Sequence, residues 1–378
     1  MMCYDGCDVV FKIDKDAGIM KTLRWVQETN MPLFCITGGF IILFCMLSLW
    51  DMSLLGAWVE AGFALAVQYC GAFWQWEVLL TFCIAMGLCC HPGSRSILGH
   101  LKKPEFSAFQ WGSMIMCTLL AGGGVFWAAG EPVWHFLNPP PYFDAIGVYD
   151  AASIALAQSF LHWGFLAWAI LGALSTILLM YYHYEKGLPL ALRTLLYPVF
   201  GQYALEGILG VVIDASAIIA VVAGTVGPIG FLGLQVGYGL ESLLGWTNTI
   251  NHQSLIIVGL VMLYTISSVT GLKRGIQWLS RANMVLALLL LLFVMIAGPT
   301  WFIIKHFISG MLTYLGHLIP MSLYRHEASV FADINQLPWL SSWTLFFWGW
   351  FMGYGPMMAM FIARISRGRS IRSVIVML

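Results

Sequence analysis

Long apolar stretches with almost no charged residues dominate this chain. A bilayer core about 30 Å thick is crossed by about 20 apolar residues in helical form, and eight stretches of the sequence meet this requirement. They cover residues 32–50, 74–90, 109–137, 153–183, 204–227, 252–271, 283–304 and 343–363. We therefore predict an all-α integral membrane protein with eight spans. Two further apolar stretches, 54–70 and 231–246, are interrupted and are interpreted as interfacial or re-entrant helices.

The composition argues against a water-soluble domain. Of the 378 residues 60% are hydrophobic and only 10% are charged, with a mean hydropathy of +0.82, whereas soluble domains carry about 25% charged residues. The formal net charge of zero gives no reason to expect nucleic acid as a partner. The nine cysteines show no metal-ligand spacing and are interpreted as small buried hydrophobic residues. No cleavable signal peptide is expected.

The basic residues alternate along the predicted topology. Sixteen of the 18 lie in the N-terminal segment or in the loops after the second, fourth, sixth and eighth spans, leaving Lys305 and Arg325. Because cytoplasmic loops are enriched in Lys and Arg, this distribution predicts an even number of spans with both termini in the cytoplasm. The long, mixed stretch 306–342 is expected to be an outer loop.

Charged residues inside spans are the usual indicators of function in a membrane protein. Here the candidates are Glu77, Glu131, His162 and Asp214. They fall on different spans and suggest no paired carboxylates, metal cluster or catalytic triad, so enzyme activity is not predicted. His162 is interpreted as a packing or hydrogen-bonding residue.

The sequence contains no P-loop, which favours passive or ion-coupled movement of a solute over ATP hydrolysis.

Two predicted spans contain helix-breaking residues. The third has Gly122–Gly124 followed by Gly130-Glu131-Pro132, and the eighth has Gly353-Tyr354-Gly355-Pro356. Glycine and proline allow a helix to unwind, and interrupted helices near mid-membrane are where secondary transporters bind solutes and ions. The alternative is close helix packing through small residues.

The eighth span also carries an aromatic stripe. Trp343, Phe347, Trp350 and Tyr354 follow helical spacing, and the last two lie near the middle of the span, away from the interfacial positions of an aromatic belt. Aromatic faces attract cations such as quaternary ammonium groups. The alternative is ordinary packing or lipid-facing aromatic residues.

Several ordered motifs support a specific interpretation. They are KPEFS (103–107), Phe126-Trp127, Glu131-Pro132, His162-Trp163-Gly164 with Trp168, Asp214 with AIIA (217–220), and the runs 271–300, 343–350 and 361–372. With these motifs the chain resembles the betaine/choline/carnitine transporter (BCCT) family over nearly its whole length.

The resemblance implies a LeuT-like inverted-repeat transporter fold with twelve spans in the complete family pattern. It divides this chain into a cytoplasmic N-terminal segment (1–30), two peripheral transmembrane helices (31–108), a first five-helix repeat (109–304), and an outer loop with the first helix of an incomplete second repeat (305–378). The implied function is secondary transport of betaine, choline or carnitine by alternating access.

The resemblance also implies site residues. The aromatic box that binds the substrate is expected to contain Trp163, Trp168, Trp348, Trp350, Phe351 and Tyr354. The glycine stretch corresponds to Ala121, Gly122, Gly123 and Gly124, and an ion site is represented by Thr225. The chain departs from the sodium-coupled betaine carriers at several of these positions. In the box, Leu171 replaces a tyrosine, and Phe351 and Tyr354 replace tryptophans. Leu119 and Ala121 replace glycines of the glycine stretch, and Val221 and Met357 replace a threonine and a phenylalanine of the ion site.

Partners and location follow from the same resemblance. We expect a zwitterionic or cationic small solute, Na⁺ or H⁺ as the coupling ion with no other cofactor, and a homotrimer. The expected location is the plasma (inner) membrane, multi-pass, with a cytoplasmic N-terminus. Because eight of the twelve family spans are present, one alternative is a truncated or split-gene partner subunit that binds solute but does not transport it alone. A second chain would then supply the remaining helices.

Overall fold

The computed structural model describes residues 30–119, 124–147, 150–271, 275–325 and 339–378, and these parts are almost entirely helical. The α-helices are α2 (Met31–Trp50), α3 (Met52–Cys90), α4 (Ala108–Leu119), α5 (Val125–Leu137), α6 (Pro141–Ile146), α7 (Ala151–Trp163), α8 (Phe165–Trp168), α9 (Leu174–Met180), α10 (Tyr197–Phe200), α11 (Gln202–Leu205), α12 (Gly207–Leu244), α13 (Ile250–Val269), α14 (Gln277–Ala297), α15 (Thr300–Ser322), α16 (Phe346–Ile365) and α17 (Ile371–Met377). π-Helical turns cover Ala169–Ala173, Tyr181–Glu185 and Ser341–Leu345. The predicted all-α class is confirmed.

Eight helical segments in the described residues are long and apolar enough to cross a membrane, which matches the predicted number. They are Met31–Trp50, Met52–Cys90, Ala151–Glu185, Gly207–Leu244, Ile250–Val269, Gln277–Ala297, Thr300–Ser322 and Ser341–Ile365. The set differs from the predicted one. Helices α4 and α5 cover the described parts of the predicted third span, 109–137, on either side of residues 120–123, which lie outside the described residues, so this span is not tested. Helix α15 qualifies in a region where a loop was expected.

The predicted separate helices at 54–70 and 231–246 are wrong. Residues 54–70 form the first part of α3, which is continuous for 39 residues, and 231–246 lies mostly in α12, which continues through Pro228. A helix of 39 residues is about 58 Å long, roughly twice the thickness of a bilayer core. A helix of this length extends beyond the apolar layer, so polar residues can lie along it without interrupting it. The polar residues in these stretches therefore do not mark separate helices.

The predicted seventh span and outer loop need a related correction. Gly298 follows the end of α14, Pro299 is the N-cap of α15, and α15 then continues to Ser322. A proline disfavours helical geometry in the residue before it, so the chain breaks here and not at residue 304. The expected loop 306–342 is therefore wrong over its first part, and residues 326–338 lie outside the described residues.

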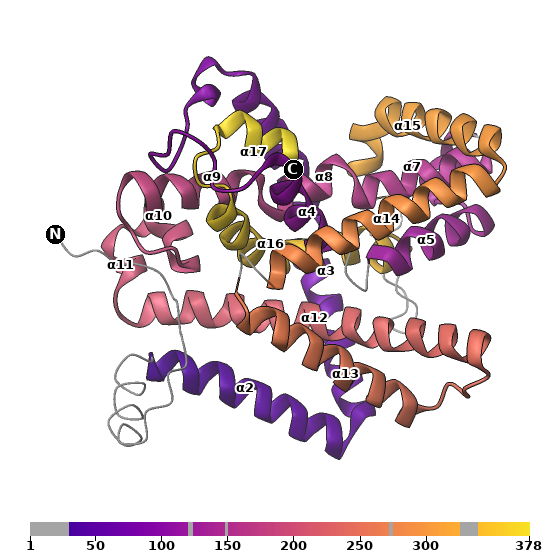
Figure 1. Cartoon of the computed structure of the whole chain (residues 1–378), viewed down its shortest axis with the longest axis horizontal. Coiled ribbons are helices and arrows are strands. Elements are labelled where there is room, and N and C mark those ends of the chain that lie inside the picture. Colours follow the sequence, from indigo (N-terminus) through magenta and orange to yellow (C-terminus); the bar gives the residue numbers. More distant parts are fainter. Residues whose placement is uncertain (1–29, 120–123, 148–149, 272–274, 326–338) are drawn as a thin grey trace.

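Two of the spanning segments are far more buried than the others. Within their apolar windows, 61% of the residues are buried for Ala151–Glu185 and 44% for Ser341–Ile365, against 22% or less in the other spanning segments. Helices α13 and α2 pack against α12, and α12 in turn contacts α16 of this core (Figure 1). The outer helices expose large apolar side chains, which is the surface expected to face lipid.

Close contacts between small residues join the two buried segments. The Gly355 position of α16 faces the backbone of Ile170 and Leu171, and Gly172 faces the backbone of Ala359. Helix α16 stays helical through Gly353–Pro356, so unwinding in this stretch is not observed. The alternative of close packing through small residues is the one the structure adopts here.

The break that does occur lies in the fourth predicted span. Helix α7 ends at Trp163, Gly164 has φ −88° and ψ −142°, and the chain continues through α8 into the π-helical turn Ala169–Ala173. A side chain on Gly164 would collide with the carbonyl oxygen of Phe160. The break places His162 and Trp163 at the last turn of α7, next to the buried core.

The C-terminal arginines fasten α16 and α17 to the segment before α4. Arg364 pairs with Glu105 at 3.1 Å, and Arg367 donates to the carbonyl of Gly99. Arg369 donates to the carbonyl of Phe106, and its guanidinium lies 4.2 Å from the ring centre of Trp111. These contacts hold one end of the core together.

Gly164→Ala tests the break in the fourth span. The added methyl group overlaps the Phe160 carbonyl, so we expect a loss of about 1–3 kcal/mol in the free energy of unfolding, measured in mixed micelles. Gly130→Ala is the control, because the nearest side-chain atom to its added methyl group, on Phe126, is 4.0 Å away. Equal stability of the two variants would contradict the assignment of the break.

Candidate functional site

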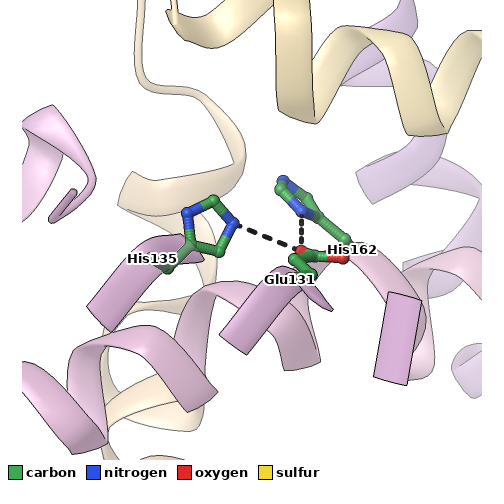
Figure 2. Close-up of side chains that lie close together, drawn as sticks. All are labelled: Glu131, His135 and His162. Carbon is green, nitrogen blue, oxygen red and sulfur yellow. Dashed lines mark hydrogen bonds and ion pairs between the residues drawn. The ribbon is translucent and has the colours of Figure 1, made fainter. Parts of the chain in front are cut away.

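A buried cluster of ionisable side chains lies between α5 and α7. Glu131 and His135 are four residues apart on α5, and therefore on one helix face, while His162 comes from the last turn of α7. Figure 2 shows both imidazoles turned toward the Glu131 carboxylate. All three side chains are fully buried.

Three nitrogen atoms surround the Glu131 carboxylate. Its Oε1 is hydrogen-bonded to Nδ1 of His162 and lies 3.3 Å from Nε2 of His135. Its Oε2 accepts a hydrogen bond of 2.6 Å from the indole Nε1 of Trp163. A buried carboxylate needs such partners, since burying an unpaired charge is very costly.

Two further polar residues hold the other side of the His162 ring. Its Nε2 lies 2.9 Å from the amide nitrogen of Gln158 and 2.9 Å from the hydroxyl of Thr344. When Gln158 donates to Nε2, the proton of the neutral ring is on Nδ1 and points at Glu131. Thr344 belongs to the π-helical turn before α16, so the network joins α5, α7 and α16.

The prediction that the charged residues of different spans remain ungrouped is wrong for Glu131 and His162. Sequence reasoning missed His135, although its spacing of four residues from Glu131 was a usable signal. The interpretation of His162 as a hydrogen-bonding residue agrees with the structure. Oδ2 of Asp214 accepts from Nη2 and Nε of Arg193 at 2.6 and 2.7 Å, and Glu77 bonds to Thr81 on its own helix.

Two imidazoles and a carboxylate also resemble a zinc donor set, and their ligand atoms lie within 4.8 Å of one another. However, Oε1 of Glu131 is already in direct contact with Nδ1 of His162, which leaves no room for an ion between them. Oε2 is occupied by the Trp163 indole. We therefore assign the cluster to hydrogen bonding and not to metal ligation.

Trp163 connects this cluster to the aromatic residues of α16. Its ring centre lies 5.2 Å from Phe347, 6.1 Å from Trp350 and 5.2 Å from Phe351, all in edge-to-face geometry. Trp350 donates from its indole nitrogen to the carbonyl of Gly224 at 2.9 Å, which ties α16 to α12.

A cavity of about 300 Å³ opens beside Trp163, at the lower end of the range for small-molecule sites. Its lining is Met116, Gly124, Trp127, Ala128, Pro132, Leu156, Ser159, Phe160, Trp163 and Trp168. Ser159 carries the one hydroxyl in this set and donates it to the carbonyl of Ala155. The cavity is therefore apolar, with three indole rings on its walls.

The predicted box residues fall into two groups. Trp163 and Trp168 line the cavity, whereas Trp350 and Phe351 contact Trp163 from α16 without lining it. Trp348 is fully buried in the core and does not line the cavity.

The remaining predicted residues are more scattered. Tyr354 lies near Gly224 of α12. Of the predicted glycine stretch, Gly124 lines the cavity, while Ala121, Gly122 and Gly123 lie outside the described residues. The hydroxyl of Thr225 donates to the carbonyl of Val222 in its own helix. The expected roles of all these residues stay predictions.

Residues 32–378 match the family model described as BCCT, betaine/carnitine/choline family transporter. The chain belongs to this family. The resemblance read from the motifs is thus confirmed, as is the class of multi-pass membrane protein; the expected division into segments stays a prediction.

Named BCCT relatives include carriers of two solutes. A glycine betaine transporter of Vibrio parahaemolyticus is 50% identical over 93% of this chain and 64% of its own length. An osmo-independent choline transporter of Acinetobacter baylyi is 37% identical over 72% of this chain and 51% of its own length. A glycine betaine transporter of Bacillus subtilis is 34% identical over 80% of this chain and 58% of its own length. The chain therefore spans about half to two-thirds of these relatives.

Trp350→Phe tests the contact between α16 and α12. Phenylalanine keeps an aromatic face but leaves the partly buried Gly224 carbonyl without this donor, so we expect a loss of about 1–2 kcal/mol in the free energy of unfolding. Trp246→Phe, at an exposed indole, is the control and should change it by less than about 0.5 kcal/mol. If both variants unfold alike, the hydrogen bond does not join the helices.

Proposed function

We propose that this protein acts in secondary transport of quaternary ammonium solutes of the betaine, choline and carnitine type. The observation that carries the proposal is the apolar cavity bounded by Trp163 and Trp168, with Trp350 and Phe351 packed behind Trp163. Family membership and the glycine betaine and choline transporters among the relatives support the same class of solute.

The chemistry of the solute fits the cavity. A quaternary ammonium group has no N–H to donate, so it needs no polar acceptor, and it is stabilised by the negative faces of aromatic rings. Each desolvated face contributes about 1–2 kcal/mol. Three indoles around one small cavity can therefore bind such a group without a carboxylate in direct contact with it.

Alternating access between two faces of the membrane is the mechanism we propose. Two features support this mechanism: the chain breaks at Gly164, beside the cavity, and α16 packs on Ala169–Ala173, just beyond that break. Na⁺ or H⁺ would couple transport to an ion gradient.

We also propose that the protein lies in the inner membrane with its N-terminus in the cytoplasm, which the alternating basic residues support. We propose a homotrimer as well, which the family resemblance supports.

Uptake of radiolabelled choline and glycine betaine tests the proposed function. In cells that lack other carriers of these solutes, the protein should give saturable uptake, and the purified protein should show saturable quenching of tryptophan fluorescence. Trp168→Leu removes one π face from the cavity wall, so we expect affinity to fall about tenfold.

Trp348→Leu is the matched control, because Trp348 is buried in the core and lies outside the cavity lining. It should lower stability while the folded fraction binds solute with unchanged affinity. A flat titration and no saturable uptake in the unmodified protein would refute the proposed function.

A further inference from the structure

A buried tyrosine of α15 lies against the break at Gly164. The side chain of this residue, Tyr314, is fully buried. Its ring stacks on Phe165 with the ring centres 6.0 Å apart, and its centre lies 6.3 Å from that of Phe160. Phe160 precedes the break and Phe165 follows it. One ring from a different helix therefore contacts both halves of the broken segment.

The break leaves two backbone N–H groups without a partner in their own segment. Gly164 donates to the carbonyl of Phe160, and Trp168 donates to that of Gly164, but Phe165 and Leu166 have no such bond among the described residues. The first N–H groups of a helix lack an acceptor within that helix. Because the bilayer core holds no water to replace it, these two groups need an acceptor from elsewhere in the protein.

The Tyr314 hydroxyl is the acceptor that faces them. The N–H groups of Phe165 and Leu166 point toward its oxygen, and a Cβ atom placed on Gly164 would lie 3.5 Å from the same atom. The hydroxyl has no partner at regular hydrogen-bond geometry among the described residues, and a buried hydroxyl with no partner at all is costly. The hydroxyl and the two N–H groups therefore compensate one another, and their contact depends on the angle between the two halves.

We propose that Tyr314 is a positioning residue of the solute cavity and acts through its hydroxyl. By holding the start of α8 relative to the end of α7, it sets how the indoles of Trp163 and Trp168 are placed around the solute. This inference rests on the proposed function.

The angle of the break matters because the two indoles lie on opposite sides of it in the chain. Trp163 ends α7 and Trp168 ends α8, and both line the cavity. Two residues five apart on a regular helix point about 140° away from each other, so an unbroken helix would direct these rings toward nearly opposite sides. The break brings both rings to one cavity, and a change in its angle moves one ring relative to the other.

Helix α15 is attached to α7 before it reaches the break. The two helices lie side by side (Figure 1), and the Ser309 hydroxyl bonds to that of Ser153. At Gly310 they approach so closely that a Cβ atom would lie 2.7 Å from Leu156, which lines the cavity. Tyr314 lies about one turn further along α15 and extends past the end of α7 to Phe165.

Tyr314→Phe tests this inference in the purified protein. The variant keeps the ring and its packing but removes the acceptor for the two N–H groups. Dissociation constants for choline chloride and glycine betaine are measured by calorimetry. Loss of one complete indole face should weaken binding about tenfold, so an indole that is displaced but still present should weaken it about threefold or more. Both solutes should weaken alike, because they share the trimethylammonium group that the indoles would contact.

Tyr142→Phe is the matched control. The Tyr142 hydroxyl, on α6, bonds to Nδ1 of His317 on α15 at 2.9 Å, so this variant also removes a tyrosine hydroxyl that contacts α15, but not one at the break. It should leave both dissociation constants unchanged to within about twofold. Unchanged affinity in Tyr314→Phe, or equal weakening in the two variants, would overturn the inference.

A readout without solute separates this inference from the proposed function. The protein is labelled with 5-fluorotryptophan, and the fluorine resonance of Trp168 is assigned with Trp168→Phe. Tyr314→Phe should shift this resonance, whereas Tyr142→Phe should not. A tyrosine that only filled space would leave the resonance in place, because phenylalanine keeps the ring. An unmoved resonance would therefore refute the positioning role, while absence of solute binding by the unmodified protein would refute only the proposed function.

Discussion

The buried Glu131 carboxylate is the interaction on which the site depends. A charge in the interior of a membrane protein is tolerated only when donors surround it, and here three side chains from two helices converge on it, with a third helix held through Thr344. Removing the Trp163 indole would leave Oε2 of Glu131 without its donor, and a buried polar atom without a hydrogen bond is costly. The cluster therefore fixes how α5, α7 and α16 are placed, and with them the walls of the cavity.

The other helices enclose the Glu131 cluster and the cavity beside it. The segments that carry Trp163 and Trp350 are the most buried in the described parts of the chain, and they approach closely because Gly355 and Gly172 lie at their contact. The outer helices expose apolar side chains and add little to the interior. Specific packing is thus concentrated around the cavity, and lipid is expected to cover the remainder.

The sequence predicts the membrane class of this protein better than it predicts the helix boundaries or the contacts between helices. The membrane class and number of spans follow from the length of apolar stretches, which is a local property. The joining of 54–70 to α3 was missed because polar residues on a long helix resemble an interruption. Glu131 and His162 lie 31 residues apart on different helices, so their contact is tertiary and no spacing reveals it. The break at Gly164 follows a single glycine, whereas the glycine-rich stretch of α16 stays helical because its glycines serve packing.

A double-mutant cycle on Glu131→Gln and Trp163→Phe tests the central claim most directly. The free energy of unfolding in mixed micelles is measured for the unmodified protein, both single variants and the double variant. If the carboxylate holds the indole, the two changes are coupled by about 1 kcal/mol or more, as for hydrogen bonds to charged groups. Effects that add to within about 0.5 kcal/mol would contradict the account, because Glu131 and Trp163 would then act independently.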